Sequence, residues 1–367
     1  MAYTTINKSS EHFSTNLWVA DDTSPRSLTN FGHQPDFVWV KHRGSANTYH
    51  TLVDSVRGGD KILASNVNAV EDTKSHGEIT SFNSDGITVA DGTSGTYPKL
   101  YFNDLNPFGA DGGNYVGWSW KANGTGSANT DGTISSTVSA SATSGFSIVS
   151  YTGDGSASAT VGHGLSVAPK MIIIKRRNAS DTWYVMHTSL SSNYNVFLNN
   201  TEPQYNVSTY TGGLISTSPT SSVFSFVNGS SVNNVNASGG TYIAYCFAEK
   251  TGYSKFGSYT GNGSSDGTFV YTGFKPAFVM WKNTTSAGYY WHTMDNKREP
   301  NNPAGLNLFP NLSNAENDYG DTCDFVSNGF KFRTGSSGLN TNGQVYIYMA
   351  FAEAPLVGTN NVPCTAR

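Results

Sequence analysis

The residues best suited to chemistry are three histidines, each followed by threonine: His50, His187 and His292. An imidazole titrates near neutral pH and binds transition metals, so three such side chains could form a pH-responsive or metal site. Each follows an aromatic cluster at a corresponding place in a repeat, so the alternative is a framework residue inherited with that repeat. No His-x-His pair and no nearby cysteine supports a metal site. We therefore predict framework histidines, with no metal and no cofactor.

Aromatic residues next to polar turns form the second group of candidates. Exposed rings stack on sugar faces or dock on partner surfaces, whereas buried rings only build the core. We predict surface or receptor contacts at five of them, which are Trp183, Tyr184, Tyr289, Tyr290 and Trp291.

The sequence contains few groups of residues that could form a catalytic site. No glycine-rich phosphate loop precedes a helix. Glycoside hydrolysis needs two neighbouring carboxylates, and the matched Glu249 and Glu353 end corresponding strands of different repeats. We predict no catalytic residue and a protein that is not an enzyme.

A threefold repeat must position these residues. Each copy has a proline, a mostly apolar run and a lysine six residues after the proline: Pro35 and Lys41, Pro169 and Lys175, Pro276 and Lys282. Each copy closes on an aromatic segment, at residues 115–120 (YVGWSW), 242–247 (YIAYCF) and 346–351 (YIYMAF). We interpret the prolines, lysines and histidines as the repeat framework and expect the lysines to be solvated charges at strand ends. In the second and third copies, an ion pair of this lysine with the closing glutamate is an alternative.

The composition predicts an all-β chain. Only 13% of the 367 residues are charged, and 39 are glycine, which favours strands and turns over helices. A net charge of −4 argues against nucleic-acid binding, and the apolar runs are too short to insert into a membrane. The start of the chain has no hydrophobic signal region, and the three cysteines have no pair spacing, so we expect synthesis in a reducing cytoplasm.

We predict three tandem, related β-sandwich domains of a jelly-roll-like kind, arranged as beads on a string. The boundaries are 1–121 for the first domain with an N-terminal attachment segment, 122–144 for a Gly/Ser/Thr-rich linker, 145–252 and 253–355 for the other domains, and 356–367 for a C-terminal tail. The proline-to-lysine strands and the closing strands are apolar on both faces. Either loops of the same domain cover the second face, or neighbouring domains or subunits do; we favour a homo-oligomer, with a trimer preferred.

The sequence resembles a family of β-rich virion proteins of marine bacteriophages, including cyanophages and pelagiphages. The resemblance covers nearly the whole chain and rests on residues 1–6, 34–41, 54–58, 160–170, 242–257, 258–263, 267–280 and 346–355. It implies a virion structural protein on the particle exterior, made in the host cytoplasm and assembled with other phage virion proteins. We expect a tail-associated fibre or appendage that mediates host attachment, with host-surface glycans as partners. The alternatives are a capsid decoration or head-fibre protein and, less favoured, a polysaccharide-cleaving tailspike.

Overall fold

The computed structural model describes residues 4–109, 112–206, 208, 211–227, 231–336, 338–357 and 364, and it is all-β. Of the described residues, only Ser9–Glu11 (η1), Pro107–Gly109 (η2) and Asn233–Asn236 (α1) are helical. Most of the predicted C-terminal tail and the first three residues of the predicted attachment segment lie outside the described residues.

The first group of strands, β1–β9, is called unit 1 below. Its larger antiparallel sheet has the order β1-β9-β3-β4-β5-β6, and its smaller sheet has the order β2-β8-β7. Side chains from both sheets form one apolar cluster between them. The strands are β1 (Phe13–Val19), β2 (Arg26–Thr29), β3 (Phe37–His42), β4 (Thr51–Asp54), β5 (Gly58–Ala64), β6 (Asp72–Thr73), β7 (Glu78–Asn83), β8 (Gly86–Ala90) and β9 (Asn114–Trp120).

Unit 2 comprises β10–β20. Its larger sheet has the order β10-β11-β12-β20-β14-β15-β16-β17, and β13-β19-β18 forms the smaller one. A second apolar cluster lies between these sheets. The strands are β10 (Ser127–Asn129), β11 (Ser136–Ser141), β12 (Phe146–Thr152), β13 (Thr160–Gly162), β14 (Met171–Arg176), β15 (Trp183–His187), β16 (Tyr194–Phe197), β17 (Tyr205–Asn206), β18 (Leu214–Ile215), β19 (Val223–Val227) and β20 (Thr241–Phe247).

Unit 3 comprises β21–β28. Its sheets have the orders β21-β28-β23-β24 and β22-β27-β26-β25, with a third apolar cluster between them. The strands are β21 (Ser254–Thr260), β22 (Phe269–Tyr271), β23 (Phe274–Asn283), β24 (Trp291–Asp295), β25 (Ala304–Asn307), β26 (Asn317–Val326), β27 (Gly329–Phe332) and β28 (Val345–Pro355).

The same connectivity therefore occurs three times. An opening strand pairs with the closing aromatic strand, which pairs with the proline-to-lysine strand and then with the strand of the aromatic cluster: β1-β9-β3-β4, β12-β20-β14-β15 and β21-β28-β23-β24. The smaller sheets also correspond, as β2-β8-β7, β13-β19-β18 and β22-β27-β26. The repeat inferred from sequence is thus a repeat of strand order.

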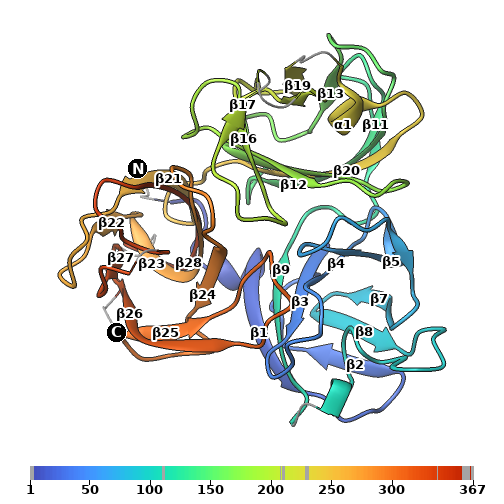
Figure 1. Cartoon of the computed structure of the whole chain (residues 1–367). Coiled ribbons are helices and arrows are strands. Elements are labelled where there is room, and N and C mark those ends of the chain that lie inside the picture. The colour runs from blue at the N-terminus through green and yellow to red at the C-terminus, as the bar shows by residue number, and fades with distance from the viewer. Residues whose placement is uncertain are drawn as a thin grey trace.

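The three larger sheets pack against one another around a common core. One apolar cluster takes residues from all three units, and Figure 1 shows the units grouped around one centre. The last aromatics of the closing strands, Trp120, Phe247 and Phe351, meet there. Their ring centroids are 6.1 Å (Trp120–Phe247), 5.6 Å (Trp120–Phe351) and 6.1 Å (Phe247–Phe351) apart.

This core explains why the strands are apolar on both faces. One face of each large sheet covers the small sheet of its own unit, and the other face covers the neighbouring units. The expectation of separate beads was wrong, because the units share one core. The apolar faces no longer argue for a homo-oligomer, because the same chain covers them.

The segment predicted as a linker is part of a sheet. Residues 122–144 include β10 and β11, and β11 pairs antiparallel with β12 from Ser136↔Tyr151 to Ser141↔Phe146. Small side chains do not prevent strand formation when a neighbouring strand supplies hydrogen-bond partners.

Asp85-Gly86 and Asn328-Gly329 lie at the turns of two hairpins. Asn83 pairs with Gly86, and Val326 pairs with Gly329, so each turn contains two residues. Gly86 has φ +143°, and a Cβ atom there would lie 2.0 Å from the carbonyl oxygen of Leu28, so only glycine fits this turn.

Candidate functional site

The three repeated lysines are buried, which contradicts the expectation of solvated charges. Lys41, Lys175 and Lys282 are 0%, 1% and 0% exposed. Their Nζ atoms donate to loop oxygens, including Ser45 O from Lys41 (3.1 Å) and Tyr289 O from Lys282 (2.5 Å). Burial lowers the pKa to about 7 for Lys41, about 8 for Lys175 and about 7 for Lys282. These lysines therefore link loops to the sheets through hydrogen bonds.

The closing glutamates do not pair with these lysines. Glu249 pairs with Lys255 at 2.8 Å, and Glu353 pairs with Lys275 at 3.4 Å.

The framework prolines occupy corresponding positions in the three units. All three are buried, and each lies two residues before a residue of the central core: Pro35 before Phe37, Pro169 before Met171 and Pro276 before Phe278.

The three histidines occupy three different positions, so they are not equivalent members of one site. His187 pairs with Met171, at the position where Asp54 pairs with Phe37. His292 pairs with Trp281 in the interior of its strand pair. His50 directly precedes β4, at the position that Trp183 and Trp291 take in β15 and β24. A shared His-Thr dipeptide does not fix strand register, because insertions of one residue change it.

Burial keeps these imidazoles neutral. It lowers the pKa of His187 and His292 to about 4, and that of His50 well below 6.5. Among the described residues, no group of three or more His, Cys, Asp and Glu side chains is placed to bind a metal ion.

A buried charge network joins unit 1 to unit 2, and the sequence analysis missed it. Arg57 and Asp54 form an ion pair of 2.5 Å with both side chains fully buried. Arg57 also contacts Glu71 (3.1 Å), which pairs with Arg177 of unit 2 (2.8 Å). Burial alone would raise the pKa of Glu71, but the hydrogen bond from Arg177 and the charge of Arg57 lower it. Tyr245 of unit 2 completes the network by donating to Asp54 Oδ2 (2.8 Å).

Unit 3 repeats this arrangement against unit 1. Arg298 pairs with Asp295 (2.6 Å) and with Glu316 (2.8 Å), and Arg43 of unit 1 pairs with Glu316 (2.7 Å). The indole N–H of Trp118 donates to Asp295 Oδ2 (3.1 Å). The signal in the sequence was the shared Asp-x-x-Arg spacing at residues 54–57 and 295–298.

The interface between units 2 and 3 has neutral residues at the same places. The amide N–H of Gln204 donates to Thr284 O (3.1 Å), just as the amide of Glu71 donates to Arg177 O (2.9 Å). His187 and Leu190 stand where Asp54 and Arg57 stand in unit 1. Two interfaces therefore depend on buried ions, and the third on neutral packing.

Three of the five predicted surface aromatics are buried, so they are wrong as contact residues. Trp183, Tyr184 and Trp291 are 0%, 0% and 1% exposed. The indole N–H groups join units: Trp183 donates to Ala64 O (2.9 Å), and Trp291 donates to Phe197 O (2.8 Å).

The other two aromatics, Tyr289 and Tyr290, line a groove of unit 3 with a volume of about 250 Å³. We call it the tyrosine groove; its other lining residues are Gly288, His292, Tyr319, Ser336, Gly338 and Leu339. Tyr290 is 39% and Tyr319 50% exposed. A Cβ atom at Gly338 would lie 2.9 Å from Nε2 of His292, so glycine keeps this nitrogen uncovered on that side. Aromatic faces with hydroxyl and imidazole groups suit a polar ring with one apolar face.

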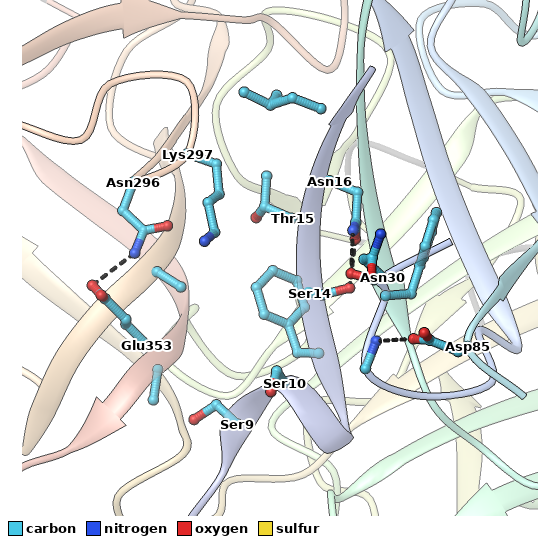
Figure 2. A pocket seen from close by; sticks show the side chains of 16 residues that line it. Ser9, Ser10, Ser14, Thr15, Asn16, Asn30, Asp85, Asn296, Lys297 and Glu353 are labelled. Carbon is cyan, nitrogen blue, oxygen red and sulfur yellow. Dashed lines mark hydrogen bonds between the residues drawn. The ribbon is translucent and has the colours of Figure 1, made fainter. Parts of the chain in front are cut away.

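A larger hollow, the β1 cleft, lies between units 1 and 3 and has a volume of about 690 Å³ (Figure 2). One side consists of η1, β1 and the segment 30–32, and the other consists of β23, β28 and the loop after β24. Figure 2 shows Thr15 directed from β1 toward Asn296 and Lys297, and Asn16 directed to Asn30 on the other side. The cleft is lined by hydroxyl and amide side chains, by apolar surface from Phe13, Ala277 and Ala352 among others, and by the charged side chains of Asp85, Lys297 and Glu353.

Three buried polar atoms in this cleft lack hydrogen-bond partners. They are Ser9 Oγ, Thr15 Oγ1 and Asn296 Oδ1. A buried, unpaired polar group costs free energy, so these atoms mark a surface suited to a polar occupant. The amide of Asn296 is held on its other side, where Nδ2 donates to Glu353 Oε2 (2.7 Å).

Together these features define an all-β protein in which three units of paired antiparallel sheets share one core, with the tyrosine groove and the β1 cleft among the hollows at the surface. None of the described helices is long and apolar enough to span a membrane. The chain belongs to the DUF7483 family, described as a domain of unknown function, whose model matches residues 8–355. No curated protein and no solved structure matches the chain.

Proposed function

We propose that the protein is a non-enzymatic structural component of the exterior of a bacteriophage particle, part of a tail fibre or appendage that adheres to glycans of the host surface. The resemblance to virion proteins of marine phages is one support. The shared core is another, because a protein exposed on a particle must keep its shape at high dilution and in salt. Most of its cohesion comes from burial, which salt does not screen.

The tyrosine groove is the observation that favours adhesion. Its exposed rings, Tyr290 and Tyr319, flank a hollow of about 250 Å³, large enough for one or two sugar rings. Rings of this kind stack on sugar C–H faces, while the hydroxyl groups and the imidazole bond sugar oxygens. One groove binds weakly, and several copies on one particle multiply the effect.

Variants of the groove test this function. Tyr319→Ala and Tyr290→Ala should each lower binding of purified protein to lipopolysaccharide from marine hosts, measured by biolayer interferometry. Tyr271→Ala is the matched control, because Tyr271 is 53% exposed in the same unit and does not line the groove. Equal binding by all three variants would refute the groove as the glycan site. Release of oligosaccharides from the glycan would instead favour the tailspike alternative.

The place on the particle is tested by copy number. A tail fibre predicts a small multiple of three or six copies, and a capsid decoration predicts hundreds, counted by quantitative mass spectrometry of purified particles. Deleting unit 1 is unsuitable as a test of attachment, because the deletion would expose the central core. Attachment through unit 1, the cytoplasmic origin and trimer formation remain parts of this proposal.

A further inference from the structure

Strand β1 is an open edge of its sheet. Of the described strands, only β9 pairs with β1. The β1 cleft is lined by five consecutive residues, 13–17. Successive side chains point to opposite faces of a sheet, so a hollow lined by all of them runs along the strand edge. The unpaired backbone N–H and C=O groups of an edge strand lie there.

In unit 2, the corresponding edge of the opening strand is occupied by another strand. There, β11 pairs antiparallel with the opening strand β12, and Ser139 lies opposite Ile148. Unit 1 bonds to one side of β11, where the amide N–H of Asn123 donates to Ser139 Oγ (2.8 Å). The small sheet bonds to the other side, where Ser136 Oγ donates to Gly162 O (3.3 Å).

The walls of the β1 cleft correspond to those around β11. In unit 1, the amide of Ser55 donates to Asp36 O (2.8 Å), and both residues bond the segment 122–124, which contacts β11. In unit 3, the amide of Asn296 donates to Ala277 O (2.9 Å), and both residues line the β1 cleft. On the other side, β2 corresponds to β13 in strand order. The β1 cleft of unit 1 therefore corresponds to the site that β11 occupies in unit 2, and corresponding elements border the two sites.

The unpaired atoms lie at this site. Ser9, Thr15 and Asn296 line the cleft and are 3%, 6% and 5% exposed, and each has one buried side-chain oxygen without a hydrogen-bond partner. Thr15 pairs with Trp118, as Ile148 pairs with Tyr245, so Thr15 has the position that Ser139 covers in unit 2.

Two exposed aliphatic side chains extend the site along β1 as far as Val19, where the edge ends because the carbonyl oxygen of Val19 accepts from Arg26 Nη1 (2.8 Å). Leu17 is 42% and Val19 54% exposed. At the same register the other opening strands carry hydroxyl residues, which are Ser150 and Thr152 in β12 and Ser258 and Thr260 in β21. The opening strand of unit 3 is also protected by charge, because it carries Lys255 paired with Glu249 at 2.8 Å. Strand β1 (FSTNLWV) has no charged residue.

We propose that β1 accepts an additional antiparallel strand, supplied by an extended, uncharged segment of a partner protein. The segment places hydroxyl or small side chains against Thr15 and Asn296, and an apolar side chain against Leu17 and Val19. Its backbone completes the edge of the sheet, as β11 does for β12. This docking role is separate from the glycan-binding role proposed above and does not depend on it.

The experiment supplies the full chain with a second copy of the β11 sequence. Residues 133–143 (TISSTVSASAT) are joined to the N-terminus by a flexible Gly/Ser linker, which gives an effective concentration on the order of 1 mM. Hydrogen–deuterium exchange is followed by mass spectrometry over residues 13–19. We expect the fast exchange of the edge amides to be lost in this fusion. A control fusion carrying V138P and A140P in the added copy should retain fast exchange.

Leu17→Lys places a charge on the edge and should restore fast exchange in the fusion, whereas Val167→Lys, at a site with a similar 40% exposure, should not. An unchanged thermal midpoint verifies that Leu17→Lys is folded. Equal exchange in the fusion, its proline control and the unmodified chain would overturn the proposal. The proposal would also be overturned if light scattering found the unmodified chain to be a dimer and the Leu17→Lys variant a monomer. The occupant of the β1 cleft would then be a second copy of this chain.

Discussion

Replacing Arg57 by leucine tests whether buried charges hold unit 1 to unit 2. Arg57 donates to Asp54 Oδ2 (2.5 Å), Leu52 O (3.0 Å), Glu71 Oε2 (3.1 Å) and Tyr245 OH (3.2 Å). Burial alone would lower its pKa, but the charges of Asp54 and Glu71 and the hydrogen bond to Asp54 raise it.

The expected loss in the free energy of unfolding follows from the hydrogen-bond partners that Asp54 would keep. Arg57→Leu leaves the Asp54 carboxylate buried at 0% exposure with neutral donors only. Breaking a buried ion pair from one side costs about 3–5 kcal/mol, whereas replacing both partners by neutral residues of suitable shape is close to neutral. Unit 2 provides the replacement, because it has His187 and Leu190 at these places. The double variant D54H/R57L should recover at least about 2 kcal/mol of the loss.

The assay is urea unfolding followed by tryptophan fluorescence and far-UV circular dichroism. Lys331→Leu is the control, because Lys331 and Asp266 form an exposed pair (31% and 83%), and a pair exposed to water contributes little to stability. The reasoning is refuted if Arg57→Leu costs less than about 1 kcal/mol, or if D54H/R57L is less stable than Arg57→Leu.

Three further predictions follow from burial. Folding lowers the pKa of His187 and His292 from 6.5 to about 4, so the unfolded chain binds more protons between these values. The contribution of each histidine to stability should be full above pH 6.5 and fall toward pH 4 by up to about 3 kcal/mol, and a flat unfolding midpoint over that range would contradict this. Phe278→Ala should cost about 3–5 kcal/mol in urea unfolding, since this ring is 1% exposed in the shared core, whereas Tyr271→Ala should have little effect. Burial raises the pKa of the Cys246 thiol, so mass spectrometry should find it unmodified by iodoacetamide in the native protein and modified after denaturation.

Much of the local structure was predictable from the sequence. A chain poor in charge and rich in glycine, threonine and aromatics forms strands, and Asp-Gly and Asn-Gly place hairpins at residues 83–86 and 326–329. The order of proline, lysine and aromatic segments also predicted the repeated strand order, because equal local patterns form equal local structures.

The site was less predictable, because partners distant in sequence decide it. Lys41 has the composition of a surface residue, yet the loop from His42 to Thr48 closes over its ammonium group. Trp183 and Trp291 follow polar turns, yet each donates to a carbonyl of the preceding unit.

The sequence by itself determined which segments are strands and that three copies share one order. The tertiary structure decided that the copies pack around one core, that two interfaces carry buried ions, and that the edge of β1 stays open while β11 covers that of β12. The pattern of apolar residues along a strand indicates that a face of the strand is apolar, but it does not indicate which sheet covers that face. That choice depends on contacts between residues tens to hundreds of positions apart, which no local pattern encodes.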